Sequence, residues 1–184
     1  MKEIYIITTY TGTVLSSIIR NYSKSSYSHI SVSLNDSLCP MYAMGRVYAR
    51  IPLIAGLVEE NVSRGLYALK PNTICRVYSL SVTERQYDLL NKNMKITWSN
   101  RRDYKYDVGG LVRFTINRPR PIVNNKYVCS NFVADLLERS NIHIFDKPSY
   151  MIQPKDFLDN DRLELIYEGL LSECNTFNGE IKIV

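Results

Sequence analysis

The chain has 184 residues, of which 45% are hydrophobic and 22% are charged, and its net charge is +5. These values are typical of a globular protein of about one domain, so a disordered, collagen-like or low-complexity chain is excluded. The mildly basic balance permits an anionic partner without demanding one. The first residues show only a short apolar run without a cleavage site, and no stretch approaches the ~20 apolar residues that span a bilayer. We therefore expect no transmembrane segment and a cytoplasmic location.

The first part of the chain shows strand and helix patterns in turn. β-Branched and aromatic residues predict a buried strand over 4–9, and apolar residues at helical spacing predict an amphipathic helix over 13–22. Polar and apolar residues alternate over 29–34, which indicates a strand with two unlike faces, and 40–46 is its expected antiparallel partner. Residues 51–58 are apolar but contain a proline and a glycine, which favours a loop or a short strand.

Helices are more frequent in the rest of the chain. A capping box, either Ser81-x-x-Glu84 or Thr83-x-x-Gln86, predicts a helix with Tyr87, Leu90 and Met94 on one face. The other expected elements are, in chain order, a strand over 73–82, a short apolar helix over 108–114, helices over 127–139 and 154–159, and a strand over 163–167. Strands and helices mix without strict alternation, so the predicted fold class is α+β.

The cysteines are widely spaced and form no Cys-x-x-Cys pair. This spacing argues against a structural zinc site, and the lack of an export signal argues against disulfides. We therefore expect no metal and no cofactor, and each cysteine is either a small buried hydrophobe or a reactive thiol. Three of them have no helix start beside them and are interpreted as structural: Cys39, Cys75 and Cys174.

The fourth cysteine has a different setting. Cys129 lies at the start of the predicted helix 127–139, and His29 begins the predicted strand 29–34. A helix N-terminus carries free N–H groups and a partial positive charge, which favour a thiolate and can hold an oxyanion. An imidazole held on a strand could serve that thiol as general base and then as general acid. The residues alone leave open the alternative that both side chains serve only in packing.

Three short segments carry a resemblance to a known family. They are Tyr-Ser-His-Ile-Ser-Val-Ser-Leu at 27–34, Met-Tyr-Ala-Met-Gly-Arg at 41–46 and Tyr-Val-Cys-Ser-Asn-Phe-Val-Ala at 127–134. Together they resemble the circularly permuted papain-like cysteine enzymes. That group includes the NlpC-type amidases, the YiiX-like hydrolases and, more distantly, the lecithin:retinol acyltransferase-like proteins. In the permuted group the strand with the histidine precedes the helix with the cysteine, which is the order found here.

The resemblance implies one permuted papain-like domain over 1–184, with a core over about 4–169. An antiparallel sheet carrying His29 would pack on the helix carrying Cys129, with Cys129 as nucleophile and His29 as base. Related enzymes often place a carboxylate on the strand after the histidine strand, and that strand offers none here. Glu60 is the substitute, orienting the imidazole from a loop, against the alternative of a surface glutamate.

The implied activity is that of a cysteine hydrolase, an amidase or peptidase. Its substrate would be a small peptide or amide, such as a peptidoglycan-derived peptide, or a lipid-like acyl group. Two alternatives stay open: a catalytically inactive binding module of the same fold, and an acyltransferase or lipase acting on a lipid ester. The sequence carries no signal of oligomeric state.

Basic residues gather before the predicted cysteine helix. A solvated charged face is preferred over an anion-binding rim, and no nucleic-acid motif accompanies them, so no nucleic-acid partner is expected. These residues are Arg101, Arg102, Lys105, Arg113, Arg118 and Arg120.

Overall fold

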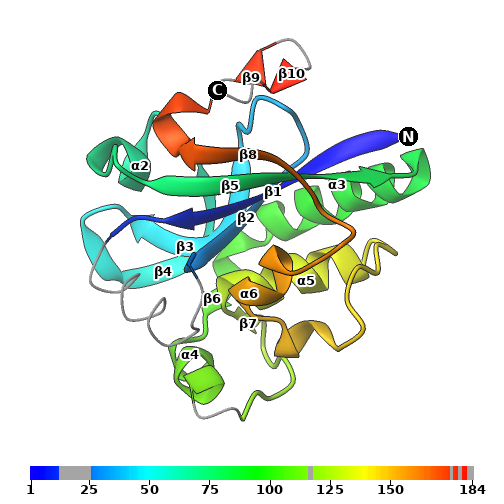
Figure 1. Cartoon of the computed structure of the whole chain (residues 1–184). Coiled ribbons are helices and arrows are strands. Elements are labelled where there is room, and N and C mark those ends of the chain that lie inside the picture. Colours follow the sequence, from blue (N-terminus) through cyan, green and yellow to red (C-terminus); the bar gives the residue numbers. More distant parts are fainter. Residues whose placement is uncertain (13–25, 116–117, 175, 178–179, 182–184) are drawn as a thin grey trace.

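The computed structural model describes residues 1–12, 26–115, 118–174, 176–177 and 180–181. Within these ranges, one sheet of eight strands has the order β7-β6-β4-β3-β2-β1-β5-β8, and a separate pair joins β9 (Thr176–Phe177) to β10 (Glu180–Ile181). Helices accompany the sheet, so the class is mixed α+β (Figure 1). The predicted helix over 13–22 lies outside the described residues.

The sheet is mostly antiparallel, and only the short pair β6–β7 is parallel among the pairs described. Its strands are β1 (Lys2–Tyr10), β2 (His29–Ser33), β3 (Met41–Tyr48), β4 (Ile51–Glu60), β5 (Ile74–Val82), β6 (Lys105–Tyr106), β7 (Lys126–Tyr127) and β8 (Glu164–Leu170). The strands predicted over 4–9, 29–34, 73–82 and 163–167 are confirmed. So is the antiparallel partner of the histidine strand, since Val32 of β2 pairs with Tyr42 of β3.

The fourth strand corrects a prediction. Residues 51–58 were expected to form a loop or a short strand, but β4 is ten residues long, Ile51–Glu60. Its proline lies between Ile51 and Ala55, where the β3–β4 register shifts, and such irregular positions tolerate a missing N–H. Gly56 pairs with Gly45 of β3 and with Lys105 of β6, and a Cβ at Gly56 would approach the Tyr104 carbonyl oxygen to 3.3 Å. The glycine therefore marks a close approach of β6 and not a break in the strand.

The helices are α2 (Gly65–Leu69), α3 (Glu84–Ser99), α4 (Val108–Thr115), α5 (Cys129–Glu138) and α6 (Pro154–Leu158), with single 3₁₀ turns at Arg101–Asp103, Ser149–Met151 and Leu171–Glu173. The four predicted helices that fall within the described ranges are confirmed as α3 to α6. The start of α3 is capped as the sequence predicts: Thr83 Oγ1 accepts from the Gln86 N–H, and the Gln86 side chain accepts from the Thr83 N–H.

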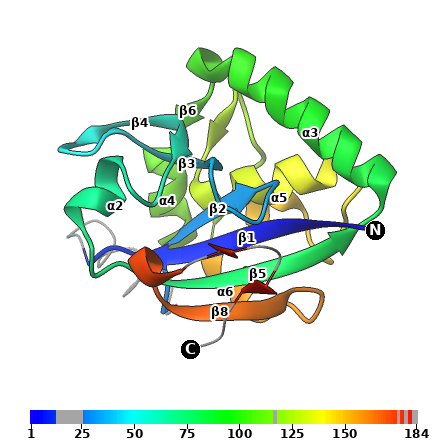
Figure 2. The same ribbon diagram turned by 90° about the horizontal axis from the view of Figure 1, so that it is seen from above.

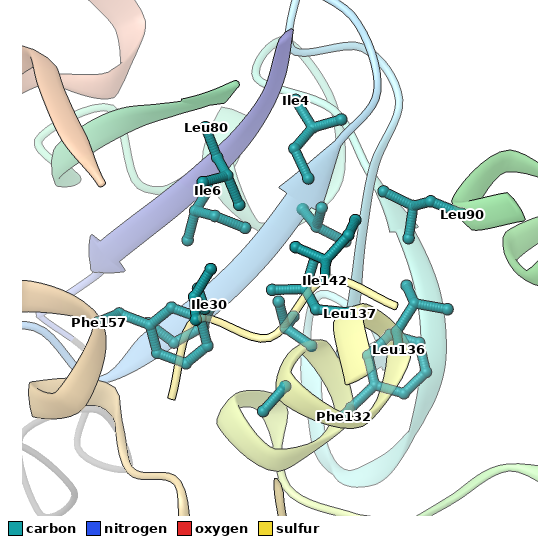
Figure 3. Packing of buried hydrophobic residues seen from close by; sticks show 14 of the residues in the cluster. Ile4, Ile6, Ile30, Leu80, Leu90, Phe132, Leu136, Leu137, Ile142 and Phe157 are labelled. Carbon is teal, nitrogen blue, oxygen red and sulfur yellow. The ribbon is translucent and has the colours of Figure 1, made fainter. Parts of the chain in front are cut away.

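Side chains alternate between the two faces of the sheet and build two apolar clusters. On one face, Ile4 and Ile6 of β1 pack with Leu90 of α3 and Phe132 of α5 (Figure 3). Figures 1 and 2 show α3 and α5 along the same flank of the sheet. On the other face, Ile7 packs with residues from α2, β3, β5 and β8. Burial of α5 against the sheet fixes the position of its first residue, where the candidate site lies.

Candidate active site

Cys129 is the first residue of α5, and a single residue separates it from the end of β7. The extended residue before it, Val128, donates its N–H to Asn131 Oδ1 at 2.8 Å and accepts from the Phe132 N–H at 3.1 Å. These bonds start the helix at the cysteine. The next backbone N–H groups have no carbonyl one turn earlier in the helix to bond, so they are available to a group bound at the helix start. The residue is 4% exposed.

His29 is the first residue of β2 and lies opposite Thr9 of β1. The preceding residue, Ser28, donates its N–H to the Thr9 carbonyl at 3.1 Å. The Ser28 carbonyl in turn lies 3.9 Å from Cys129 Sγ, within the range of a hydrogen bond from sulfur. The start of β2 and the start of α5, 100 residues apart in the chain, therefore meet at one point.

Glu60 is the last residue of β4, and its carboxylate contacts the imidazole of His29. His29 Nε2 lies 3.0 Å from Oε1 and 3.2 Å from Oε2 of Glu60. The side chains are 20% and 13% exposed. The alternative of a surface glutamate is therefore wrong, and so is the placement in a loop. The carboxylate stands two strands away from the imidazole, because β3 lies between β2 and β4.

Gly45 of β3 makes that reach possible. A Cβ at this position would lie 3.2 Å from Glu60 Oε1 and 3.6 Å from His29 Cε1. It would also meet Val58 Cγ2 at 3.0 Å, which is closer than real Cβ contacts normally come. The pair therefore sits over the one backbone position of the intervening strand that has no side chain to displace it.

The charged forms of His29 and Glu60 stabilise each other. Burial disfavours the imidazolium of His29, but the Glu60 carboxylate and a hydrogen bond with the Cys129 side chain raise its pKa well above the usual value. Burial likewise acts against the Glu60 carboxylate, but His29, Ser31 and Tyr67 lower the pKa of that carboxyl below its ordinary value. Both shifts favour the imidazolium–carboxylate ion pair.

This arrangement can support nucleophilic chemistry. Because Nε2 is engaged with Glu60, the other ring nitrogen, Nδ1, is the one left for the Cys129 sulfur. A carboxylate on the far side of a histidine fixes its tautomer and stabilises the imidazolium that forms when it takes a proton. The helix start supplies N–H groups for an oxyanion.

Some neighbours of the site were missed at the sequence level. Tyr106 of β6 pairs with Tyr127, two residues before Cys129. Burial, then the nearby Cys129 and Asp107, raises the pKa of its phenol, which stays protonated. The hydroxyls of Ser31 and Tyr67 bond Glu60. Ser31 carries a sequence signal, since it follows His29 by two residues in a strand and so shares its face. Tyr67 carries none.

The remaining cysteines do not join this cluster. Cys75 is buried in the second apolar cluster, and its burial, with smaller effects of Cys174 and Glu168, raises its thiol pKa. Burial raises the pKa of Cys174 to about 11. Cys39 is exposed, and Asn61 Nδ2 lies 2.9 Å from its sulfur. His143 is exposed in the loop after α5.

The basic span is made of separate local contacts. Arg101 stacks on Trp98, with the guanidinium carbon 5.0 Å from the ring centroid. Arg113 bonds Asp107 Oδ2 at 2.5 Å. Within the described ranges, no three His, Cys, Asp or Glu side chains gather as a metal would require, and no helix has the length and apolarity to cross a bilayer.

Comparison with known proteins adds no relative. No protein-family model matches the sequence, and no curated protein matches it significantly.

Proposed function

We propose that this protein is a cysteine hydrolase of permuted papain-like fold, with Cys129 as nucleophile, His29 as general base and acid, and Glu60 as the residue that orients His29. The observation that carries the proposal is the convergence of a cysteine at the first residue of a helix with a partly buried His–Glu pair. The bond cleaved is a carboxylic amide or ester, and an amide in a small peptide is the preferred substrate.

The first half of the reaction transfers an acyl group to sulfur. In the reactive state the thiol proton of Cys129 already resides on His29, and the Cys129 thiolate attacks the carbonyl carbon, forming the C–S bond. The carbonyl oxygen becomes an oxyanion and accepts hydrogen bonds from the backbone N–H groups at the start of α5. His29 then gives its proton to the leaving nitrogen or oxygen as that bond breaks, which leaves a thioester on Cys129.

The second half returns the enzyme. His29 takes a proton from water, the hydroxide attacks the thioester carbon, and the C–S bond breaks, which restores the Cys129 thiolate beside the protonated His29. Glu60 keeps its negative charge throughout and compensates the imidazolium twice in each cycle. The products are a carboxylic acid and an amine or alcohol.

The contact of Glu60 with His29 also bears on the alternatives. An inactive binding module needs no residue to orient His29, whereas the bonds of 3.0 and 3.2 Å from His29 Nε2 to Glu60 supply such a residue. The geometry therefore favours catalysis over mere binding. An acyltransferase would use the same first half and differ only in the acceptor.

Trapping of the thioester tests the proposal. The protein is mixed with an activated acyl ester and with peptide amides, and the acyl adduct is located by mass spectrometry. We expect one adduct on Cys129, absent in Cys129→Ala and retained in Cys75→Ala, which removes the other fully buried thiol. Adding a short alcohol or amine tells an acyltransferase from a hydrolase by the product formed. Equal acylation of wild type and Cys129→Ala would overturn the assignment.

A further inference from the structure

The carboxylate of Glu60 holds more partners than His29 alone. Ser31 Oγ donates to Oε2 at 2.6 Å, and Tyr67 OH donates to the same oxygen at 3.2 Å. With the two contacts of His29 Nε2, donors from β2 and α2 converge on a residue of β4. A carboxylate offers about four acceptor positions, so these contacts fill most of its capacity.

The direction of these bonds follows from proton counting. Burial and the nearby Glu60 charge raise the pKa of the Tyr67 phenol well above its usual value, so it keeps its proton and donates. Thr9 Oγ1 lies 3.3 Å from Tyr67 OH, and since the phenol has a single proton, Thr9 is the donor in that contact. The chain runs from Thr9 to Tyr67 to Glu60. Every group around Glu60 donates, which fits the ionised carboxylate and leaves little place for a carboxyl proton.

The fold builds this arrangement from three separate elements. Ser31 shares the face of β2 that carries His29, because side chains two apart in a strand point the same way. Tyr67 comes from α2, the short helix after β4 that covers this face, and is 5% exposed. Its ring packs in the second apolar cluster, so the apolar contacts fix the ring and aim its hydroxyl.

We propose that Ser31 and Tyr67 are positioning residues that hold Glu60 ionised and fixed in the geometry in which it serves His29. The proposal rests on the proposed function, in which His29 in turn serves Cys129. A charge-assisted hydrogen bond is about twice as strong as a neutral one, so loss of either hydroxyl weakens the carboxylate form. His29, which acts on the reacting atoms, then depends on the hydroxyls of Ser31 and Tyr67 through their hydrogen bonds to Glu60.

Other charges also act on Glu60 and must be held constant. A hollow of about 430 Å³ is lined by Glu60 and Tyr67 together with Glu59, Arg46, Arg64 and Arg101. His29 faces the carboxylate from β2, and Cys129 lies beyond His29. Because none of these charges changes when a single hydroxyl is removed, a shift in the pKa of the Glu60 carboxyl reports the lost hydrogen bond.

The test measures the titration of Glu60 itself. In protein with ¹³C-labelled glutamate carboxyls, the Glu60 signal is assigned with Glu60→Gln and followed against pH in Tyr67→Phe and Ser31→Ala. We expect the carboxyl pKa to rise by about one unit in each variant. The acid limb of Cys129 alkylation by iodoacetamide moves to higher pH by a similar amount, because protonated Glu60 no longer supports the imidazolium that accompanies the thiolate. Ser31→Thr, which keeps a hydroxyl, restores the wild-type titration.

Matched controls separate this role from general loss of a hydroxyl. Tyr87→Phe removes a phenol that bonds the Leu34 carbonyl at 2.9 Å, and Ser33→Ala removes a hydroxyl from the same face of β2 that bonds the Asn35 carbonyl at 3.1 Å. Both leave the Glu60 titration unchanged. If Tyr67→Phe fails to fold, Ser31→Ala and Ser31→Thr decide the outcome.

The result also tells failure of this inference from failure of the proposed function. An unmoved Glu60 titration in both Tyr67→Phe and Ser31→Ala, with Cys129 still reactive, refutes the positioning role and leaves the hydrolase standing. The opposite result is a shifted pKa of the Glu60 carboxyl in the variants together with a Cys129 that reacts no faster in the native protein than in urea. That result supports the hydrogen-bond network and overturns the catalytic proposal.

Discussion

Cys75 and Cys129 are both buried, at 0% and 4% exposure, yet their surroundings differ in kind. Cys75 lies within β5, opposite Thr9, among apolar side chains such as Ile7 and Val77. Burial raises the pKa of its thiol and keeps it neutral. Cys129 begins a helix and has beside it an imidazole that Glu60 holds in the charged form.

Burial alone therefore does not decide whether a cysteine is inert. A thiol surrounded only by apolar side chains loses the hydration of its charged form, and no other polar group replaces the water. A thiol at a helix start next to an imidazolium finds fixed dipoles and a countercharge in place of water. If Cys75 and Cys129 react alike in solution, their surroundings do not differ in this way.

The largest expected effect is on the cysteine itself. With iodoacetamide at pH 6, we expect native Cys129 to be alkylated at least about 100-fold faster than Cys75, because only Cys129 has a group beside it that stabilises a thiolate. Peptide mass spectrometry measures both sites in one sample. Cys129→Ala should leave the protein almost unlabelled at this pH, whereas Cys75→Ala should label as the wild type does. Similar rates at the two sites would remove the distinction.

Loss of the imidazole comes next. His29→Gln should lower hydrolysis of any substrate found by about 10²- to 10⁴-fold, the usual contribution of a general base. Alkylation of Cys129 at pH 6 should fall toward that of the unfolded chain. His143→Gln is the control, since it changes the other histidine of the chain. A His29→Gln variant that keeps full activity would mean that another group takes the proton.

Glu60→Gln should have a smaller effect on rate, about tenfold, and a measurable effect on stability. Because folding raises the pKa of His29, this residue contributes its full stabilisation below pH 6.5 and loses it as pH rises through the pKa of the folded state. Because folding lowers the pKa of Glu60, this residue contributes its full stabilisation above pH 4.5 and loses it as pH falls through the pKa of the folded state. The stability lost in Glu60→Gln is therefore greatest between pH 4.5 and 6.5, at about 2 kcal/mol.

Urea unfolding of wild type and Glu60→Gln at several pH values measures this difference. The gap between the two proteins should narrow toward acid pH, where Glu60 takes a proton, and toward alkaline pH, where His29 loses one. Glu59→Gln, one residue earlier on β4, is the control and should show no such window. A gap that does not vary with pH would show that no ion pair forms.

The smallest expected effect comes from Gly45→Ala. Its new methyl carbon would lie 3.0 Å from Val58 Cγ2 and 3.2 Å from Glu60 Oε1, so the carboxylate must shift. Overpacking of this kind destabilises by about 1–3 kcal/mol, and we expect the alkylation rate of Cys129 at pH 6 to drop by a few-fold. Gly56→Ala, at the paired position of β4, disturbs the sheet near Tyr104 and leaves the alkylation rate unchanged. Equal effects of the two variants would deny Gly45 a special role.

The sequence predicted the elements that have a strong local pattern. Period-two alternation located β2, and a stripe of apolar residues located α5, with Cys129 at its start. The pairing of His29 with Cys129 followed from element order and from short motifs. These are properties of neighbours in the chain, and a single sequence displays them.

The rest depended on contacts between distant strands. Glu60 was assigned to a loop because Pro52 and Gly56 broke the strand pattern before it, whereas pairing with β3 and with β6 keeps β4 within the sheet. Its reach to His29 depends on the absence of a side chain at Gly45, which is fixed only by the register of the β3–β4 pair. The hydroxyl of Tyr67 arrives from a five-residue helix that has no strong pattern of its own.

Cross-linking in solution tests the central claim most directly, namely that the sulfur of Cys129 and a ring nitrogen of His29 adjoin. A 1,3-dihaloacetone alkylates a reactive thiol with one arm and then a second nucleophile within a few bond lengths with the other. We predict a single intramolecular bridge that joins the peptide containing Cys129 to the peptide containing His29, and its loss in His29→Gln. A bridge from Cys129 to a different residue, or only single alkylation at full reaction, would contradict the account.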